Sequence, residues 1–133
     1  MSEILIDPDI ETAVIVYLNT ALAEIEGESA TASDKTHDKR CVRVILVGGQ
    51  GRVARVLTPF LLAFDSYDVT EKLAGRLAAL VGGLILALEG TVISGVVVAA
   101  VTAAGAAANL PDPLDDRPRY SQAITIRARA QAL

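Results

Sequence analysis

The side chains best suited to nucleophilic chemistry are His37 and Cys41, a possible thiolate–imidazole pair. They stand four residues apart in a segment that we expect to be extended, which would separate them by about 13 Å. The serines Ser66, Ser94 and Ser121 lack a base, because His37 is the only histidine in the chain. We therefore interpret His37 as a polar loop residue and Cys41 as a small strand residue.

The tripeptide Gly48-Gly49-Gln50 matches the motif with which peptide-chain release factors hydrolyse peptidyl-tRNA. Here it connects two apolar segments of an acidic chain, in which we expect no broad RNA-binding surface. The same glycines do not form a phosphate-binding loop, because no Gly-Lys-Ser/Thr follows and no helix is predicted there. The favoured interpretation is a turn that uses the positive φ angles open to glycine.

Acidic residues gather in one proline-rich segment, where Asp112, Asp115 and Asp116 stand close together. They lack the ligand spacing and the glycine of a calcium loop, so we expect a solvated loop. One cysteine and one histidine are too few for a structural zinc site. With no catalytic set and no cofactor or metal expected, the sequence points to a binding or assembly protein.

The chain has 133 residues and a mass of 13.9 kDa, which suits a single domain spanning 1-133. Its lone cysteine excludes an intramolecular disulfide framework and favours a reducing cytosol. A net charge of −4 and a pI of about 4.9 argue against a general nucleic-acid binder. The first residues lack a basic segment and a long apolar run, so we expect no targeting signal.

The longest apolar run, residues 77–108, contains a single charge, Glu89. Its length alone would permit a membrane span. However, Glu89-Gly90-Thr91 divides the run, and residues 91–101 are rich in β-branched side chains, which favour a strand. No Lys/Arg cluster or aromatic belt flanks it. A small membrane-associated protein built on residues 77–101 is therefore an alternative, not the favoured interpretation.

The first predicted element is a helix that starts at Asp7 and Pro8, a capping residue and a residue suited to the first turn. Its apolar residues recur with helical spacing and predict one buried stripe. They are Ile10, Val14, Tyr17, Leu18, Ala21, Leu22 and Ile25. Residues 1–28 hold seven acids and no Lys or Arg, so the outer face of this helix should be acidic.

Residues 29–37 are small and polar, and fit either a solvated edge strand or a loop. Strands are predicted at 41–47 and 52–64, joined as a hairpin through the glycine-rich segment. Pro59 has no N–H to donate, which places that part of the second strand at an edge or a bulge.

A second helix is predicted after Ser66 or Asp68, with Leu73, Leu77, Leu80, Val81, Leu84 and Leu88 at helical spacing. Gly82-Gly83 would weaken it by about 1 kcal/mol per glycine unless close packing on the sheet requires small residues. A strand at 91–101, a turn-rich loop at 111–118 and a last strand at 119–129 follow. This order predicts an α+β domain, with two helices packed on one face of a mostly antiparallel sheet.

Charge is distributed unevenly along the chain. Residues 29–64 carry six basic and two acidic side chains, beside the wholly acidic charge of residues 1–28. Such asymmetry suits contacts between like subunits. In the last strand, Ile124 and Ile126 with Tyr120 should face the core, and Arg127 and Arg129 the other side, where they could pair with acids of a neighbouring subunit or face water.

At this level the chain resembles the tail terminator (tail completion) proteins of long-tailed, siphovirus-type bacteriophages. The matching features run through nearly the whole chain: the opening Asp7-Pro8-Asp9-Ile10-Glu11, then Val42-Arg43-Val44 with Val47-Gly48-Gly49, the helix after Phe64, Pro111-Asp112-Pro113, Pro118-Arg119-Tyr120, and a strand with Thr125 and Arg127. Leu110 departs from the pattern, since relatives often carry an aromatic residue there.

The resemblance implies a virion protein, assembled in the host cytoplasm, that forms a homo-oligomeric ring, commonly a hexamer. Such a ring caps the head-proximal end of the tail tube, stops polymerisation of the tube protein and joins the head connector, while DNA passes through its lumen. It implies no enzyme activity, cofactor or membrane. Another head-tail connector or neck protein is the alternative. We predict interface roles for the arginines Arg43, Arg52, Arg55, Arg119, Arg127 and Arg129.

Overall fold

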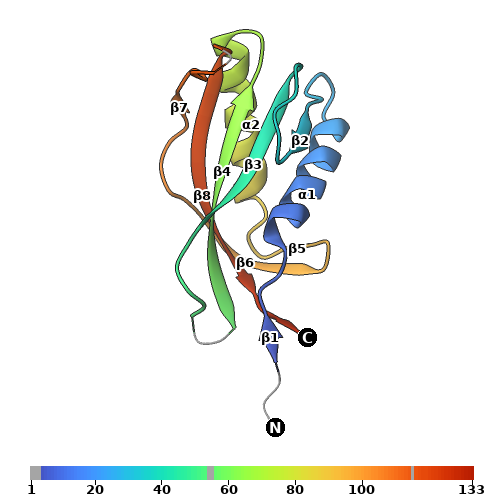
Figure 1. Cartoon of the computed structure of the whole chain (residues 1–133). Coiled ribbons are helices and arrows are strands. Elements are labelled where there is room, and N and C mark those ends of the chain that lie inside the picture. Colours follow the sequence, from blue (N-terminus) through green and yellow to red (C-terminus); the bar gives the residue numbers. More distant parts are fainter. Residues whose placement is uncertain (1–3, 54–55, 115) are drawn as a thin grey trace.

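The computed structural model describes residues 4–53, 56–114 and 116–133. A seven-stranded, mostly antiparallel sheet has the order β2-β3-β4-β8-β6-β5, with β7 paired to β8 (Figure 1). The elements are β1 (Leu5–Ile6), α1 (Ile10–Glu24), β2 (Thr31–Ser33), β3 (Cys41–Gly48), β4 (Leu57–Tyr67), α2 (Glu71–Leu86), β5 (Val92–Ile93), β6 (Val96–Ala103), β7 (Ala108–Asn109), β8 (Arg119–Arg129) and β9 (Gln131–Ala132). β1 and β9 form a separate two-stranded ribbon.

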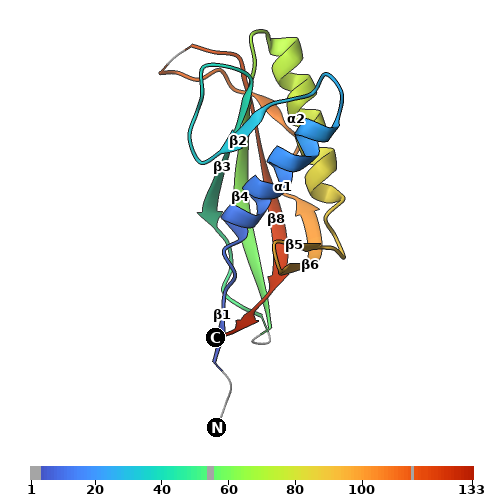
Figure 2. The same ribbon diagram turned by 90° about the vertical axis from the view of Figure 1, so that its right-hand side faces the viewer.

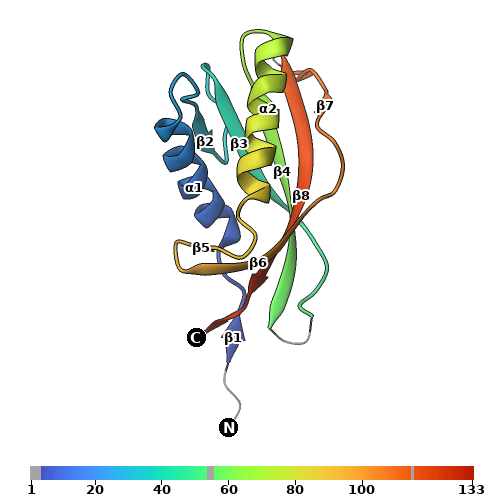
Figure 3. The same cartoon turned by 180° about the vertical axis from the view of Figure 1, so that it is seen from behind.

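Both helices lie on one face of the sheet, which confirms the predicted α+β arrangement (Figures 2 and 3). The core between the layers is built from alternate residues of the strands and one stripe of each helix. Its largest fully buried members include Leu18, Leu22, Leu62, Leu77 and Ile126.

Helix α1 begins two residues later than expected. Asp9, not Asp7, is the N-cap, and its carboxylate accepts a hydrogen bond from the backbone N–H of Thr12 at 3.1 Å. Asp7 instead accepts from Arg52 and from the hydroxyl of Thr58, which binds the start of the chain to the β3–β4 hairpin. The prediction of Asp7 as the cap was wrong because Asp7 and Asp9 both suit that role. They are distinguished only by the distant Arg52 and Thr58, which bind Asp7.

The polar segment after α1, residues 29–37, contains both an edge strand and a loop, the two structures that its sequence allowed. Thr31–Ser33 form β2, an edge strand parallel to β3, while the chain from Asp34 to Arg40 turns back. This return brings the backbone of His37 next to Cys41, with the amide nitrogen 3.4 Å from Sγ. The expected extended spacing of these two residues was therefore wrong.

Strands β3 and β4 form the predicted hairpin, but β4 runs from Leu57 to Tyr67 instead of from 52 to 64. The ladder between them has a register irregularity between Leu46 and Gly48 and ends at Leu61, so Pro59 lies beyond the last residue of β4 that pairs with β3. Pro59 pairs with β8 on the other side. The prediction that proline marks an edge or bulge is confirmed on the β3 side.

Helix α2 is capped by Thr70, whose hydroxyl accepts from the amide of Leu73 at 3.2 Å. The predicted caps, Ser66 and Asp68, were wrong, because β4 continues through Ser66. Gly82 faces the sheet, where a Cβ would lie 3.0 Å from the side-chain oxygen of Gln122. Its small size permits close packing, which offsets the low helix propensity of glycine.

The long apolar run is divided among α2, β5, β6 and the first residue of β7. Its first part belongs to α2, and the strand expected at 91–101 is a tight hairpin of β5 and β6. Ser94 and Gly95 turn this hairpin with φ angles of 46° and 78°. Among the described residues, no helix has the length and apolar character needed to cross a membrane.

Polar side chains occupy backbone groups along the edges of the sheet. The amide of Asn19 bonds both the N–H and the carbonyl of Ala32 in β2, each at 2.9 Å. The carboxylates of Glu11 and Glu89 accept from the amides of Leu46 in β3 and Val101 in β6. These contacts satisfy groups that could otherwise recruit another strand.

Strand β8 provides the clearest test of the predicted alternation. Ile124 and Ile126 are buried on the helix side, as predicted, while Arg129 on the other side is exposed. We expect Ile126→Asp to prevent folding, because an unpaired carboxylate in the core costs several kcal/mol, roughly the stability of a small domain. Circular dichroism and thermal unfolding measure this, with Arg129→Asp as the matched control that should fold. A folded Ile126→Asp variant would contradict the assignment of the two faces.

Candidate functional site

The face of the sheet opposite the helices, here called the open face, is the candidate site. Cross-strand pairing places its side chains in rows: Arg43, Asp65 and Ser121; Ile45, Ala63 and Ala123; Leu61 and Thr125; Pro59 and Arg127. The middle rows consist of small or apolar residues that are only partly buried. Figure 1 views the molecule from this side. A partly apolar surface of this kind suits contact with another protein.

The upper end of the open face holds a polar cluster around Asp65, which is 8% exposed. The hydroxyl of Ser121 donates to its carboxylate at 2.6 Å, and Arg119 lies 3.9 Å away. Arg119 also donates to the carbonyl of Leu110 at 2.7 Å. Arg119 therefore holds the 110–118 loop against the sheet.

Tyr67 lies under that loop and is fully buried. Its hydroxyl donates to Asp112 at 3.0 Å, and the guanidinium of Arg117 lies 4.5 Å from its ring centre, a cation–π contact. Burial raises the pKa of Tyr67, and the hydrogen bond and charge of Asp112 act in the same direction, against the lowering effect of Arg119. The phenol stays protonated and serves as a fixed donor to the loop.

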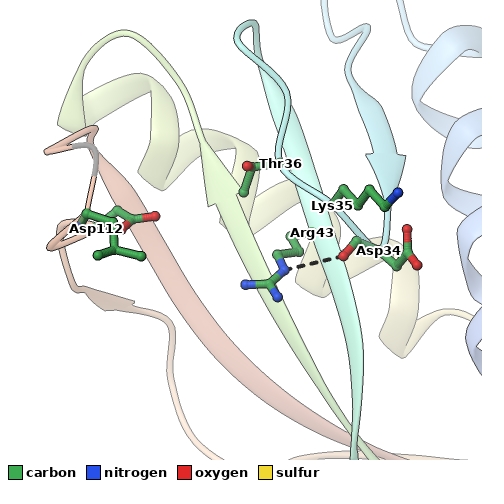
Figure 4. A pocket seen from close by; sticks show the side chains of 6 residues that line it. Asp34, Lys35, Thr36, Arg43 and Asp112 are labelled. Atoms are coloured by element: carbon green, nitrogen blue, oxygen red, sulfur yellow. Dashed lines mark hydrogen bonds between the residues drawn. The ribbon is translucent and has the colours of Figure 1, made fainter.

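A pocket of about 360 Å³ opens beside this cluster, between the 34–36 segment and the 110–118 loop (Figure 4). Arg43 points into it and donates to the carbonyl of Asp34 at 3.4 Å, with Lys35 on one side and Asp112 across the gap. Leu114 at its rim is 96% exposed. The opposite charges in the lining leave no strong preference for either an anion or a cation.

A second hollow, of about 230 Å³, lies lower on the open face. Gly49, Gln50, Leu61, Thr125 and Arg127 line it, with Pro59. Arg127 is half-buried, and within the part of the chain that the structure describes its side chain makes no hydrogen bond or ion pair. A cation held beside apolar side chains with no partner is the strongest sign on this face of an external acidic contact.

The six predicted interface arginines have different surroundings. Arg43, Arg119 and Arg127 lie on the open face, and Arg129 follows them on the same side of β8. Arg52 instead pairs with Asp7 and the carbonyl of Leu5 within the chain. Arg55 lies outside the described residues. The interface roles of all six stay predictions.

An ion-pair network that the sequence did not reveal connects the segment after α1, the residue before β3, the residue after β4, and α2. Arg40 lies 2.6 Å from Glu28 and 3.1 Å from Asp68, and Arg76 reaches Glu28 at 3.2 Å. The hydrogen bond from Arg40 chiefly lowers the pKa of Glu28, with Arg76 adding to the effect against partial desolvation. Because its members come from four separate segments, spacing along the chain gave no signal for it.

The glycines of the tripeptide Gly48-Gly49-Gln50 adopt backbone conformations that other residues rarely adopt. Gly48 and Gly49 have φ angles of 143° and 128°, and a Cβ on Gly49 would collide with the carbonyl oxygen of Pro59. This confirms the turn interpretation. Among the residues described, no three His, Cys, Asp or Glu side chains gather as metal ligands.

In comparisons with known proteins, no family model matches the chain and no curated protein matches it significantly.

Removing the Arg119 side chain should loosen the 110–118 loop. We expect Arg119→Ala to lose the charged hydrogen bond to Leu110, which contributes about 2 kcal/mol. Limited digestion with a protease that cleaves before aspartate should then cut at Asp112 or Asp116 faster than in the wild type. Arg129→Ala is the matched control, and equal cleavage rates for the two variants would contradict the anchoring role.

Acid should weaken the Glu28 network. A carboxyl whose pKa is lowered by folding contributes stability that is present above its ordinary pKa of 4.5 and is lost as the pH falls through the lowered pKa. Urea unfolding at pH 7 and pH 3.5 should show a smaller acid loss for Glu28→Gln than for the wild type. Asp38→Asn, a change to an exposed residue, should keep the wild-type loss; a Glu28→Gln variant that also keeps it would count against the network.

Proposed function

We propose that this protein is a non-enzymatic ring-forming component of a bacteriophage tail, which ends the growth of the tail tube at its head-proximal end. The observation that carries the proposal is the open face, where partly exposed Ile45, Leu61, Ala63 and Ala123 adjoin the unpaired Arg127. Helices cover the other face, and Asn19, Glu11 and Glu89 occupy backbone groups at parts of the β2, β3 and β6 edges. The open face is therefore the surface on which subunits of a ring would meet.

The long axis of the molecule supports a role between two other components. The β3–β4 hairpin exposes Val53 and Val56 at one end, and Val69 and Leu114 are exposed at the other, eleven residues of β4 away. One end would contact the last ring of tube protein and the other the head connector. The acidic net charge disfavours tight contact with DNA passing through the lumen.

A second head-tail joining role, that of a connector or neck protein, uses the same two ends and the same ring. The difference lies in the partner of the hairpin end: a terminator binds the tube protein there. Binding of the purified protein to isolated tail tubes distinguishes the two roles.

The mass of the purified protein, measured by light scattering after size exclusion without detergent at several concentrations, tests the proposal. We expect a closed ring, with about six times the mass of the 13.9 kDa chain, or a monomer that forms a ring on tail tubes. Electron microscopy of tubes mixed with the protein should show one capped end. Protein that can be extracted only with detergent, or that binds neither itself nor tubes, would contradict the proposal.

A further inference from the structure

A pair of opposite charges lies at one height of the sheet, on its two sides. The carboxylate of Glu89, three residues after the end of α2 on the helix side, accepts from the amide of Val101 at 3.1 Å (Figure 3). Val101 pairs with Ile126 of β8. The next residue, Arg127, lies on the open face and makes no hydrogen bond or ion pair with any described residue. The strand register therefore places the exposed Glu89 and the unpaired Arg127 at the same height.

Unpaired charges also lie on both sides near the Tyr67–Arg119 end of the sheet. On the helix side, Glu24 and Glu26 are exposed, and their side chains make no hydrogen bond or ion pair with any described residue. The last turn of α1 contains no basic residue, so the helix dipole disfavours these acids. On the open side, the exposed Lys35 lines the pocket beside Arg43, and its ammonium group has no partner among the described residues either.

The other described acids of the first 28 residues are occupied within the chain, which corrects the expected acidic outer face of α1. They are Asp7, which binds Arg52, Asp9, which caps the helix, Glu11, which caps β3, and Glu28, which belongs to the ion-pair network. Between its two ends the exposed side of α1 is uncharged. The unpaired acids of this segment are therefore confined to the C-terminal end of α1.

Small and apolar side chains lie between the two heights on both sides of the molecule. On the outer side of α2, Ala79 and Gly83 are exposed and Leu86 is 45% exposed. Contacts of Gln122 with α2 place this part of the helix at the height of Ala123 on the open face, above the hollow of about 230 Å³. Small side chains on both surfaces allow close approach, and the hollow can receive a larger apolar side chain.

We propose that the helix side of one copy of the chain docks on the open face of the next, both the same way up, with Glu89 meeting Arg127 and with Glu24 and Glu26 meeting Lys35. The inference rests on the proposed function and deepens it, by assigning the contact between neighbouring subunits. The two surfaces differ, so the contact is head-to-tail, and repetition closes a ring when the rotation permits. Because the heights match, every hairpin end points to the same rim of the ring.

Charge exchange between variants tests the contact. Arg127→Glu, Glu89→Arg, Lys35→Glu and the double variant Glu24→Lys/Glu26→Lys should each weaken self-association at least about tenfold, and added salt should weaken the wild-type contact. Equimolar mixtures of Arg127→Glu with Glu89→Arg, or of Lys35→Glu with the double variant, should regain the wild-type mass by light scattering. A mixture of Arg127→Glu with the double variant should not, because each reversed charge then still meets a like charge.

Glu89→Gln separates the effect of the charge from an effect on folding. Its side-chain oxygen can still accept from the amide of Val101, so this variant should keep the wild-type thermal stability. Its self-association should nevertheless weaken, because Arg127 loses the opposite charge. A Glu89→Gln variant that assembles as tightly as the wild type would contradict the pairing of Glu89 with Arg127.

Matched controls use the exposed Asp38 and Lys39, which line a different hollow. Asp38→Lys and Lys39→Glu change charge by the same amounts and should keep the wild-type mass. Variants that stay fully assembled, a matched mixture that fails to reassociate, an unmatched mixture that reassociates, or controls that dissociate equally would each overturn the contact. A wild-type chain that is monomeric in solution and forms rings only on tubes, with Arg127→Glu and Glu89→Gln rings unchanged there, would overturn it while leaving the proposed function intact.

Discussion

The unbroken pairing of β4 with β8 is the constraint on which the rest of the structure depends. Eleven consecutive residue pairs, from Leu57 with Arg129 to Tyr67 with Arg119, fix which side chains face the helices and which face outward. A slip of one residue would move Phe60, Leu62 and Phe64 out of the core. The helices, the outer strands and the hollow lined by Pro59, Leu61, Thr125 and Arg127 take their positions from this pair.

Alternation along a strand and periodicity along a helix are local signals, and the elements that depend on them were predicted well. The bounds and both faces of β8 agree with the sequence prediction, as do the existence of both helices and the sheet side that they cover. The helix caps were not predicted, because distant partners, Arg52 and Thr58, bind Asp7, and because β4 continues through Ser66. The β5–β6 hairpin was not predicted because its two-residue turn at Ser94 and Gly95 lies inside a run that is otherwise rich in β-branched residues. Asp65 gave one usable signal, since a charge inside an otherwise apolar strand requires a buried partner.

The contacts at the sheet edges disfavour assembly through strand pairing, which leaves the open face as the surface proposed for assembly. Asn19, Glu11 and Glu89 come from helices or loops, and each satisfies backbone groups that a further strand would need. Growth of the sheet from chain to chain is thereby discouraged. The proposed association would then use side chains on a face, where charge and shape determine the partner and its orientation.

The small ribbon of β1 and β9 has a consequence for the order of folding. Its two residue pairs join the opposite ends of the chain, so it closes a loop that contains nearly every other residue. The entropy lost in closing so long a loop exceeds what two pairs return, until the sheet has already brought the ends together. The ribbon therefore forms after the main sheet and opens before it, and the protection of its amide hydrogens against exchange reports whether the whole domain is complete.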